Sequence, residues 1–153
     1  DVPQAGRPLR RTLGIAMSCV LRAAGENFDV EAFLVEFQAA PISTWKKGEK
    51  RSQGASANRT SGVRFQVSGA EFSDLSAQVN DALSFLQAHR EWLARLVSFP
   101  GVERVVADFG TESKPPYWAS FVFEPSLLVA LGEAGIALEI SVYPSSESEA
   151  GDA

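Results

Sequence analysis

Several segments of the chain carry apolar residues at every second position, which is the period of a strand with one face on a core. The first such series is formed by Leu13, Ile15, Met17, Cys19 and Leu21. Residues 136–143 alternate without exception, so we expect strands in both segments. Shorter segments of the same character predict four further strands, at residues 42–46, 63–67, 102–109 and 117–123.

Three other segments have apolar residues at helical spacing. The first follows Asp29, whose side chain can cap a helix N-terminus, and ends before Pro41. The longest is expected to run from a cap at Ser73 to the Pro100-Gly101 pair as one continuous helix. The third has Pro125 in its first turn and Gly135 at its C-terminal exit, which is the usual placement of these two residue types.

The predicted order of elements is therefore β-α-β-β-α-β-β-α-β. Strands that are apolar on one side, together with three helices, predict an α+β fold in which a mainly antiparallel sheet carries its helices on one face. A doubly wound nucleotide-binding fold is disfavoured, because its strands would be continuously apolar. We expect a single domain over residues 13–143, a flexible tail at residues 1–12 and a disordered acidic tail at residues 144–153.

The composition fits one globular domain: the chain has 153 residues, of which 45% are hydrophobic. No apolar run approaches the roughly 20 residues that a membrane-spanning helix needs, so we expect a soluble, cytoplasmic protein without membrane contacts. The net charge of −5 divides into +4 up to Arg64 and −9 from Phe65 onward. An acidic chain of this kind is a poor candidate for nucleic-acid binding.

The sequence offers few candidates for catalysis. His89 and Cys19 are the only histidine and the only cysteine, too few for the common zinc sites. Cys19 also falls on the inward side of its strand, where a thiol is inert. Ser43 and Lys46 have the spacing of a helical Ser-x-x-Lys nucleophile, but in a strand their side chains would point to opposite faces. We therefore expect no catalytic residue, no metal and no cofactor.

A polar loop at residues 47–60 is longer than most connections in a compact domain, and such loops are often functional. From Trp45 to Arg64 the chain is basic, with Arg59 among its cations and Glu49 as its only acid. An indole beside flexible cations can recognise an acidic protein or a small anionic ligand. The same residues also fit a solvated loop whose Trp45 anchors a strand end. The residues expected to bind are Trp45, Lys46, Lys47, Glu49, Lys50, Arg51 and Arg64.

Two functions from different classes follow from these residues. The first is a non-enzymatic binding module, of the adaptor or immunity type, that uses the basic loop. The second is a small enzyme or metabolite-binding domain with a carboxylate site on the sheet. The residues of that alternative site are Asp108, Glu112, Trp118 and Glu139. The oligomeric state stays open.

The stretch Thr44-Trp45-Lys46-Lys47-Gly48-Glu49, which follows Gly25, Phe28 and Asp29, resembles the DUF4279 family of small bacterial proteins. The closing segment Gly135-Ile136-Ala137-Leu138-Glu139-Ile140-Ser141-Val142-Tyr143 is similar too, so that the likeness covers residues 13–143. The chain departs from the family pattern at Val63-Arg64-Phe65, where a Trp is expected, and at Ser141, where an acidic residue is expected. The resemblance implies a fold and a bacterial cytoplasmic origin, and it implies no activity.

Overall fold

A computed structural model of the chain describes residues 17–145. The elements in this range follow the order β-α-β-β-α-α-β-α-β. Their bounds are β1 Cys19–Gly25, α1 Val30–Phe37, β2 Ser43–Trp45, β3 Ser61–Ser68, α2 Leu75–Ala88, α3 Arg90–Ser98, β4 Arg104–Ser113, α4 Pro125–Ala134 and β5 Ala137–Pro144. The predicted tail at residues 1–12, and residues 146–153 of the other predicted tail, lie outside the described residues.

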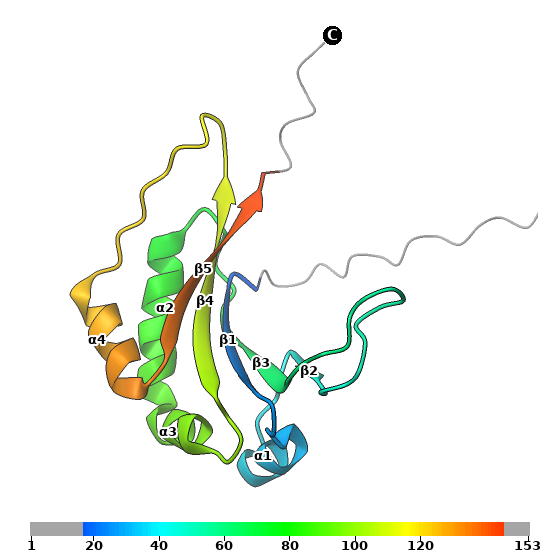
Figure 1. The fold of residues 1–153 in the computed structure, drawn as a ribbon. Coiled ribbons are helices and arrows are strands. Elements are labelled where there is room, and N and C mark those ends of the chain that lie inside the picture. The colour runs from blue at the N-terminus through cyan, green and yellow to red at the C-terminus, as the bar shows by residue number, and fades with distance from the viewer. Residues whose placement is uncertain (1–16, 146–153) are drawn as a thin grey trace, which may run out of the picture.

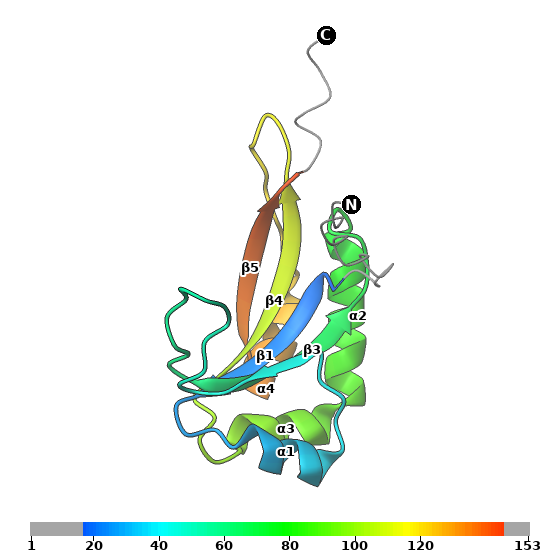
Figure 2. The same ribbon diagram turned by 90° about the vertical axis from the view of Figure 1, so that its right-hand side faces the viewer.

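The strands form one five-stranded sheet in the order β2-β3-β1-β4-β5 (Figures 1 and 2). The pairs β2–β3, β3–β1 and β1–β4 are antiparallel, whereas β4 and β5 are parallel. The predicted mainly antiparallel sheet with three helices is therefore wrong, because the described residues form a mixed sheet and four helices. The parallel pair arises because α4 follows β4 in the chain and returns it to the end of the sheet where β4 begins. β5 therefore runs in the same direction as β4.

The long helix expected from Ser73 to Pro100 is two helices, α2 and α3, which meet at His89. The backbone of His89 leaves the helical region, with φ −114° and ψ 23°. This bend lets α3 fold beneath the end of the sheet, next to α1 (Figure 2), and Leu93 and Leu96 of α3 are buried in the core. The predicted N-cap of α2, Ser73, is one residue too early. Asp74 accepts the hydrogen bond from the Ala77 N–H, at 3.0 Å.

Residues 117–123 form no strand, contrary to the prediction, and belong to the connection between β4 and α4. No strand position is open to them beside β4, because β1 and β5 already occupy its two edges. Tyr117 and Trp118 in this connection are exposed. Phe123 packs against Phe109 of the core instead, with the ring centroids 5.5 Å apart, so the apolar residues of this segment are divided between the surface and the core without forming a strand.

Several local predictions are confirmed. Asp29 caps α1 by accepting a hydrogen bond from the Ala32 N–H at 3.0 Å. Pro125 opens α4, and Gly135 ends it with φ 71°. The first strand is shorter at its start than expected, since Met17 precedes β1 and is exposed, while Leu13 and Ile15 lie outside the described residues.

The helices supply one side of the hydrophobic core, and alternate residues of the sheet supply the other (Figure 1). The strand residues that face the helices are buried, among them Leu21, Val63, Ala107 and Phe109. The residues between them point to the opposite side, which we call the open face. Polar and charged side chains gather there, and they define the candidate site.

Candidate functional site

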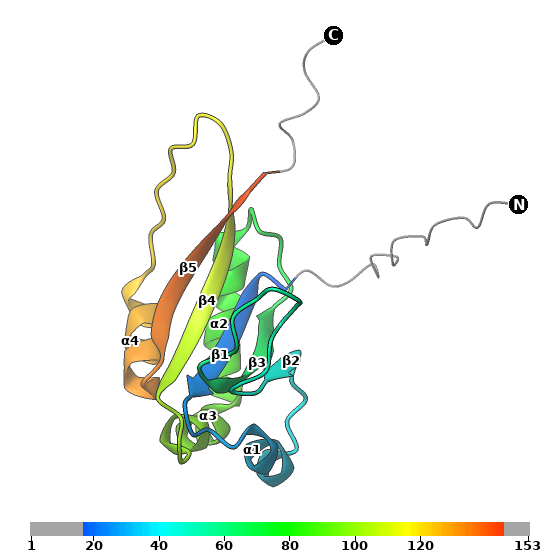
Figure 3. The same cartoon turned by 45° about the vertical axis from the view of Figure 1, so that its right-hand side comes forward.

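The connection between β2 and β3, residues 46–60, projects from the open face (Figures 1 and 3). Its neck is closed by backbone hydrogen bonds from the Gly48 N–H to the Asn58 carbonyl and from the Asn58 N–H to the Glu49 carbonyl, each at 2.8 Å. Lys50 and Ala57 add an isolated β-bridge. The predicted loop is thus an ordered extension of the β2–β3 hairpin, with its tip at residues 51–56.

The two lysines at the start of the predicted patch turn away from the other cations. Lys46 Nζ lies 2.6 Å from Glu31 Oε1, and Lys47 Nζ lies 2.6 Å from Glu26 Oε1. The hydrogen bond to Glu31 raises the pKa of Lys46, and the hydrogen bond from Lys47 lowers the pKa of Glu26. Both lysines are thus engaged with carboxylates near α1, and the structure does not bring them to Arg51 and Arg64.

Arg51 and Arg64 do meet, in a cavity of about 520 Å³ between the hairpin extension and the open face. Arg22 from β1 and Arg59 from the hairpin extension complete a set of four arginines around it. We call this site the arginine cavity. Its lining is Arg22, Ala24, Trp45, Arg51, Ser56, Ala57, Asn58, Arg59, Thr60 and Arg64. The predicted residues Lys46, Lys47, Glu49 and Lys50 are not part of it.

Trp45 forms a wall of the arginine cavity and does not enter the hydrophobic core. Its indole packs over Gly62, where a Cβ atom would stand 2.1 Å from the indole Cζ2. The indole N–H donates to Thr60 Oγ1 at 3.4 Å. The Arg64 guanidinium lies over the ring, 5.2 Å from its centroid, in a cation–π contact. A glycine at position 62 is therefore needed to seat the indole, and the indole positions Arg64.

Positive charge is in excess around the arginine cavity, because four arginines and no carboxylate line it. Burial lowers the pKa of Arg64, and repulsion by Arg51 and then Arg22 lowers it further. Within residues 17–145, Arg51, Arg59 and Arg64 make no ion pair with a carboxylate. Like charges that face one cavity, three of them without an ion-pair partner in the described residues, favour binding of an anion.

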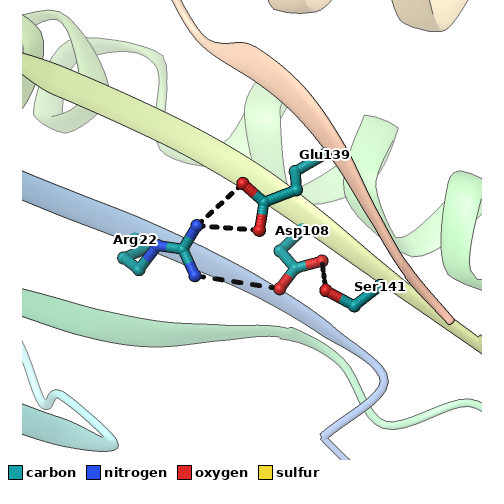
Figure 4. A network of polar contacts seen from close by, with 4 residues as sticks. All are labelled: Arg22, Asp108, Glu139 and Ser141. Carbon is teal, nitrogen blue, oxygen red and sulfur yellow. Dashed lines mark hydrogen bonds and ion pairs between the residues drawn. The ribbon is translucent and has the colours of Figure 1, made fainter. Parts of the chain in front are cut away.

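Arg22 lines the arginine cavity and also contacts the predicted carboxylate site. Figure 4 shows its contacts with that site. Its Nη2 donates to both carboxylate oxygens of Glu139 at 2.9 Å, and its Nη1 lies 3.9 Å from Asp108 Oδ2. The Ser141 hydroxyl donates to Asp108 Oδ1 at 2.7 Å. The strand order β1-β4-β5 produces this network, because Asp108 of β4 pairs with Glu139 of β5 and with Val20 of β1.

The other two residues of the alternative site lie elsewhere. Glu112 is near the end of β4 and pairs with Lys114 at 3.5 Å. Trp118 is exposed in the connection after β4. The structure thus unites Asp108 and Glu139 and leaves Glu112 and Trp118 out. Sequence reasoning missed Arg22, although a charged residue between the buried positions of an alternating strand is a signal for the open face.

Cys19 and His89, which were considered for catalysis from the sequence, do not line the arginine cavity. Cys19 is buried in the core, and this burial raises the pKa of its thiol to about 12. His89 lies at the α2–α3 junction with its ring 4.5 Å from that of Phe85. In the part of the chain that the structure describes, no three His, Cys, Asp or Glu side chains gather as a metal site would require. None of the helices described there has the length and apolar character to cross a membrane.

Both departures from the family pattern fall at this site. Arg64 lines the arginine cavity, and Ser141 holds Asp108 by a hydrogen bond. A side chain such as Trp could not supply the charge of Arg64, and an acid at position 141 would face the Asp108 carboxylate without a proton to donate. These two residues therefore shape the charge of the open face in this chain.

Comparison with known proteins identifies the family and goes no further. No curated protein shows a significant match to the chain. The solved structures likewise contain no significant match. The family profile described as a domain of unknown function, DUF4279, matches residues 15–145. The resemblance noted from the sequence is thereby confirmed, and the chain belongs to the DUF4279 family.

Proposed function

We propose that the chain is a non-enzymatic binding module that captures an acidic segment of a partner protein in the arginine cavity. The observation that carries the proposal is the convergence of Arg51, Arg59 and Arg64 on one cavity without a carboxylate partner in the described residues. A bound carboxylate would relieve the repulsion between these guanidinium groups. Guanidinium groups suit this task because their N–H donors match the two oxygens of a carboxylate.

The position of the arginines strengthens the proposal. Arg64 is partly buried and held over the Trp45 ring, so an ion pair made there is screened less by water than one on an exposed lysine. Arg22 contributes less free charge, because Glu139 and Asp108 already lie beside it. The attraction for an acidic segment therefore concentrates on the side of the cavity formed by the hairpin extension.

The network around Arg22 favours binding over the alternative of an enzyme with a carboxylate site. Glu139 accepts two hydrogen bonds from Arg22, and Asp108 accepts one from Ser141. A general base needs a carboxylate oxygen that is free to take a proton from a substrate. Here both carboxylates instead hold side chains of the open face in place.

The test uses a fluorescently labelled peptide of consecutive glutamates, whose binding is measured by anisotropy. One variant combines Arg51→Gln, Arg59→Gln and Arg64→Gln. The control combines Lys46→Gln, Lys47→Gln and Arg95→Gln, which removes the same charge from exposed ion pairs outside the cavity. We expect the cavity variant to lose affinity by at least about tenfold, and the control to change by less than about threefold.

Binding of this peptide should also weaken as salt is added, since its charges are paired near the surface. Free citrate and inorganic phosphate serve as competitors that show whether a small anion can occupy the same cavity. Equal loss of affinity in the two variants would overturn the proposal, because the effect would then come from net charge alone. Absence of saturable binding by the native chain would overturn it as well.

A further inference from the structure

β5 is an edge strand with little protection against pairing. It is the last strand of the sheet, and in residues 17–145 no strand pairs with its outer edge (Figure 2). Edge strands of monomeric proteins are usually guarded by charges, by bulges or by short length. β5 is eight residues long, and its pairing with β4 is regular from Ala137 to Pro144. Its single charged residue, Glu139, is held by Arg22.

Exposed apolar side chains are frequent in the part of the chain that ends with β5. Among residues 17–145, ten large hydrophobic residues are exposed, and eight of them lie between Tyr117 and Tyr143. This segment comprises the connection after β4, then α4 and β5, which neighbour one another in Figures 1 and 3. The eight residues are Tyr117, Trp118, Val122, Leu128, Val129, Ile140, Val142 and Tyr143. Three of them, Ile140, Val142 and Tyr143, belong to β5 itself.

We propose that β5 pairs with β5 of a second copy of this chain, antiparallel and about a twofold axis, so that the two sheets become continuous. The proposal does not depend on the anion site. It commits to a second copy because β5 is complementary to itself in charge. With Ile140 opposite Ile140 of the second copy, Leu138 faces Val142 and Glu139 faces Ser141. No like charges oppose each other, which cross-strand pairs require for stability.

The alternation of β5 restricts the possible registers. Residues opposite each other must point to the same face of the combined sheet, so Ile140 can face itself, Leu138 or Val142, but not Glu139. A register centred on Glu139 would bring two carboxylates together and is disfavoured. The register centred on Ile140 pairs residues 137–143 of each copy, and it covers the exposed side chains of Ile140 and Val142 with those of the partner strand.

The interface is tested by the mass of the native chain in sedimentation or light scattering. We expect twice the chain mass of 16.5 kDa at submillimolar concentration. Ile140→Lys places two lysines opposite each other and should give a monomer. Val35→Lys is the matched control, since Val35 is exposed on α1 away from β5. It should remain a dimer. A native monomer, or equal behaviour of the two variants, would overturn the interface.

The register is tested by cysteine cross-linking. The native thiol, Cys19, does not interfere, because it is buried and is the only cysteine in the sequence. Under mild oxidation Ile140→Cys should form a covalent dimer, because antiparallel neighbours lie within disulfide distance. Val142→Cys faces Leu138 and should cross-link poorly, as should Val35→Cys. Cross-linking of Ser141→Cys in place of Ile140→Cys would rule out the proposed register. Binding of a foreign peptide to β5 of a native monomer would rule out a second copy of this chain as the partner of β5.

Discussion

Arg22 holds together the two polar clusters of the open face. One side of its guanidinium contacts Glu139 and approaches Asp108, and the residue also lines the arginine cavity. These contacts come from three adjacent strands, so the position of Arg22 is set by the sheet and not by a mobile segment. An arginine held in this way needs little reordering when a ligand arrives, which lowers the entropic cost of binding.

Cys19 gives a prediction at the level of a single residue. Burial, with a smaller effect of the Asp108 and Asp81 carboxylates, raises the pKa of its thiol from 9.0 to about 12. At pH 10 the folded chain keeps this proton while the unfolded chain loses it, so folding becomes less favourable as the pH rises above 9. Between pH 8 and pH 10 the native chain should lose on the order of 1 kcal/mol of stability relative to Cys19→Ala.

Urea unfolding of the native chain and of Cys19→Ala at both pH values measures this difference. Comparing the change with pH, rather than the stabilities themselves, removes the packing lost with the sulfur atom. As a control, a thiol reagent should modify the folded chain slowly and the unfolded chain fast. Identical pH dependence in the two proteins would show that the Cys19 thiol is not shielded as the structure indicates.

The start of α2 gives a prediction at the level of an element. Asp74→Ala should destabilise the chain by about 1 kcal/mol, because the Ala77 N–H loses its acceptor at the helix N-terminus. Ser73→Ala, one residue earlier, should change stability by less than about 0.5 kcal/mol. Thermal or urea unfolding of both variants measures the contrast. A larger loss of stability in Ser73→Ala than in Asp74→Ala would show that Ser73 is the N-cap, as expected from the sequence.

Elements could be predicted from the sequence where their signals are local. Asp29, Pro125 and Gly135 act on the backbone within a few residues, and each ends or begins a helix as expected. The break at His89 could not be predicted in this way, since the apolar stripe is continuous, whereas α3 packs against α4 and contacts α1, which come from distant parts of the chain. The same limit applies to residues 117–123, whose alternation suits a strand but finds both edges of β4 occupied.

Residues of the candidate site could be predicted from the sequence only where they lie close together in the chain. Trp45, Arg51 and Arg64 could be anticipated because they lie within twenty residues of one another on a basic segment. The contacts of Arg22 with Glu139 could not, because those residues are 117 positions apart and meet only through the strand order β1-β4-β5. Lys46 and Lys47 lie apart from these arginines because their ion-pair partners, Glu31 and Glu26, come from α1 and the turn before it.

The two proposed surfaces predict independent behaviour of the whole molecule. The arginine cavity lies on the open face between β1, β3 and the hairpin extension, whereas the proposed interface follows the outer edge of β5. Ile140→Lys should therefore bind the glutamate peptide with an affinity within about threefold of the native chain. The triple cavity variant should in turn keep the native mass in sedimentation. Loss of peptide binding by Ile140→Lys would show that the cavity is complete only in the pair.

The closed neck of the hairpin extension divides the four cavity arginines into two groups. Arg22, Arg59 and Arg64 lie on the sheet side of the bonds that join Gly48 and Glu49 to Asn58, and Arg51 lies in the tip beyond them. Surface turns of this kind accept insertions and exchanges without strain elsewhere. Substitutions within residues 51–56 should therefore change the tip of the hairpin extension and leave Arg22, Arg59 and Arg64 in place around the arginine cavity.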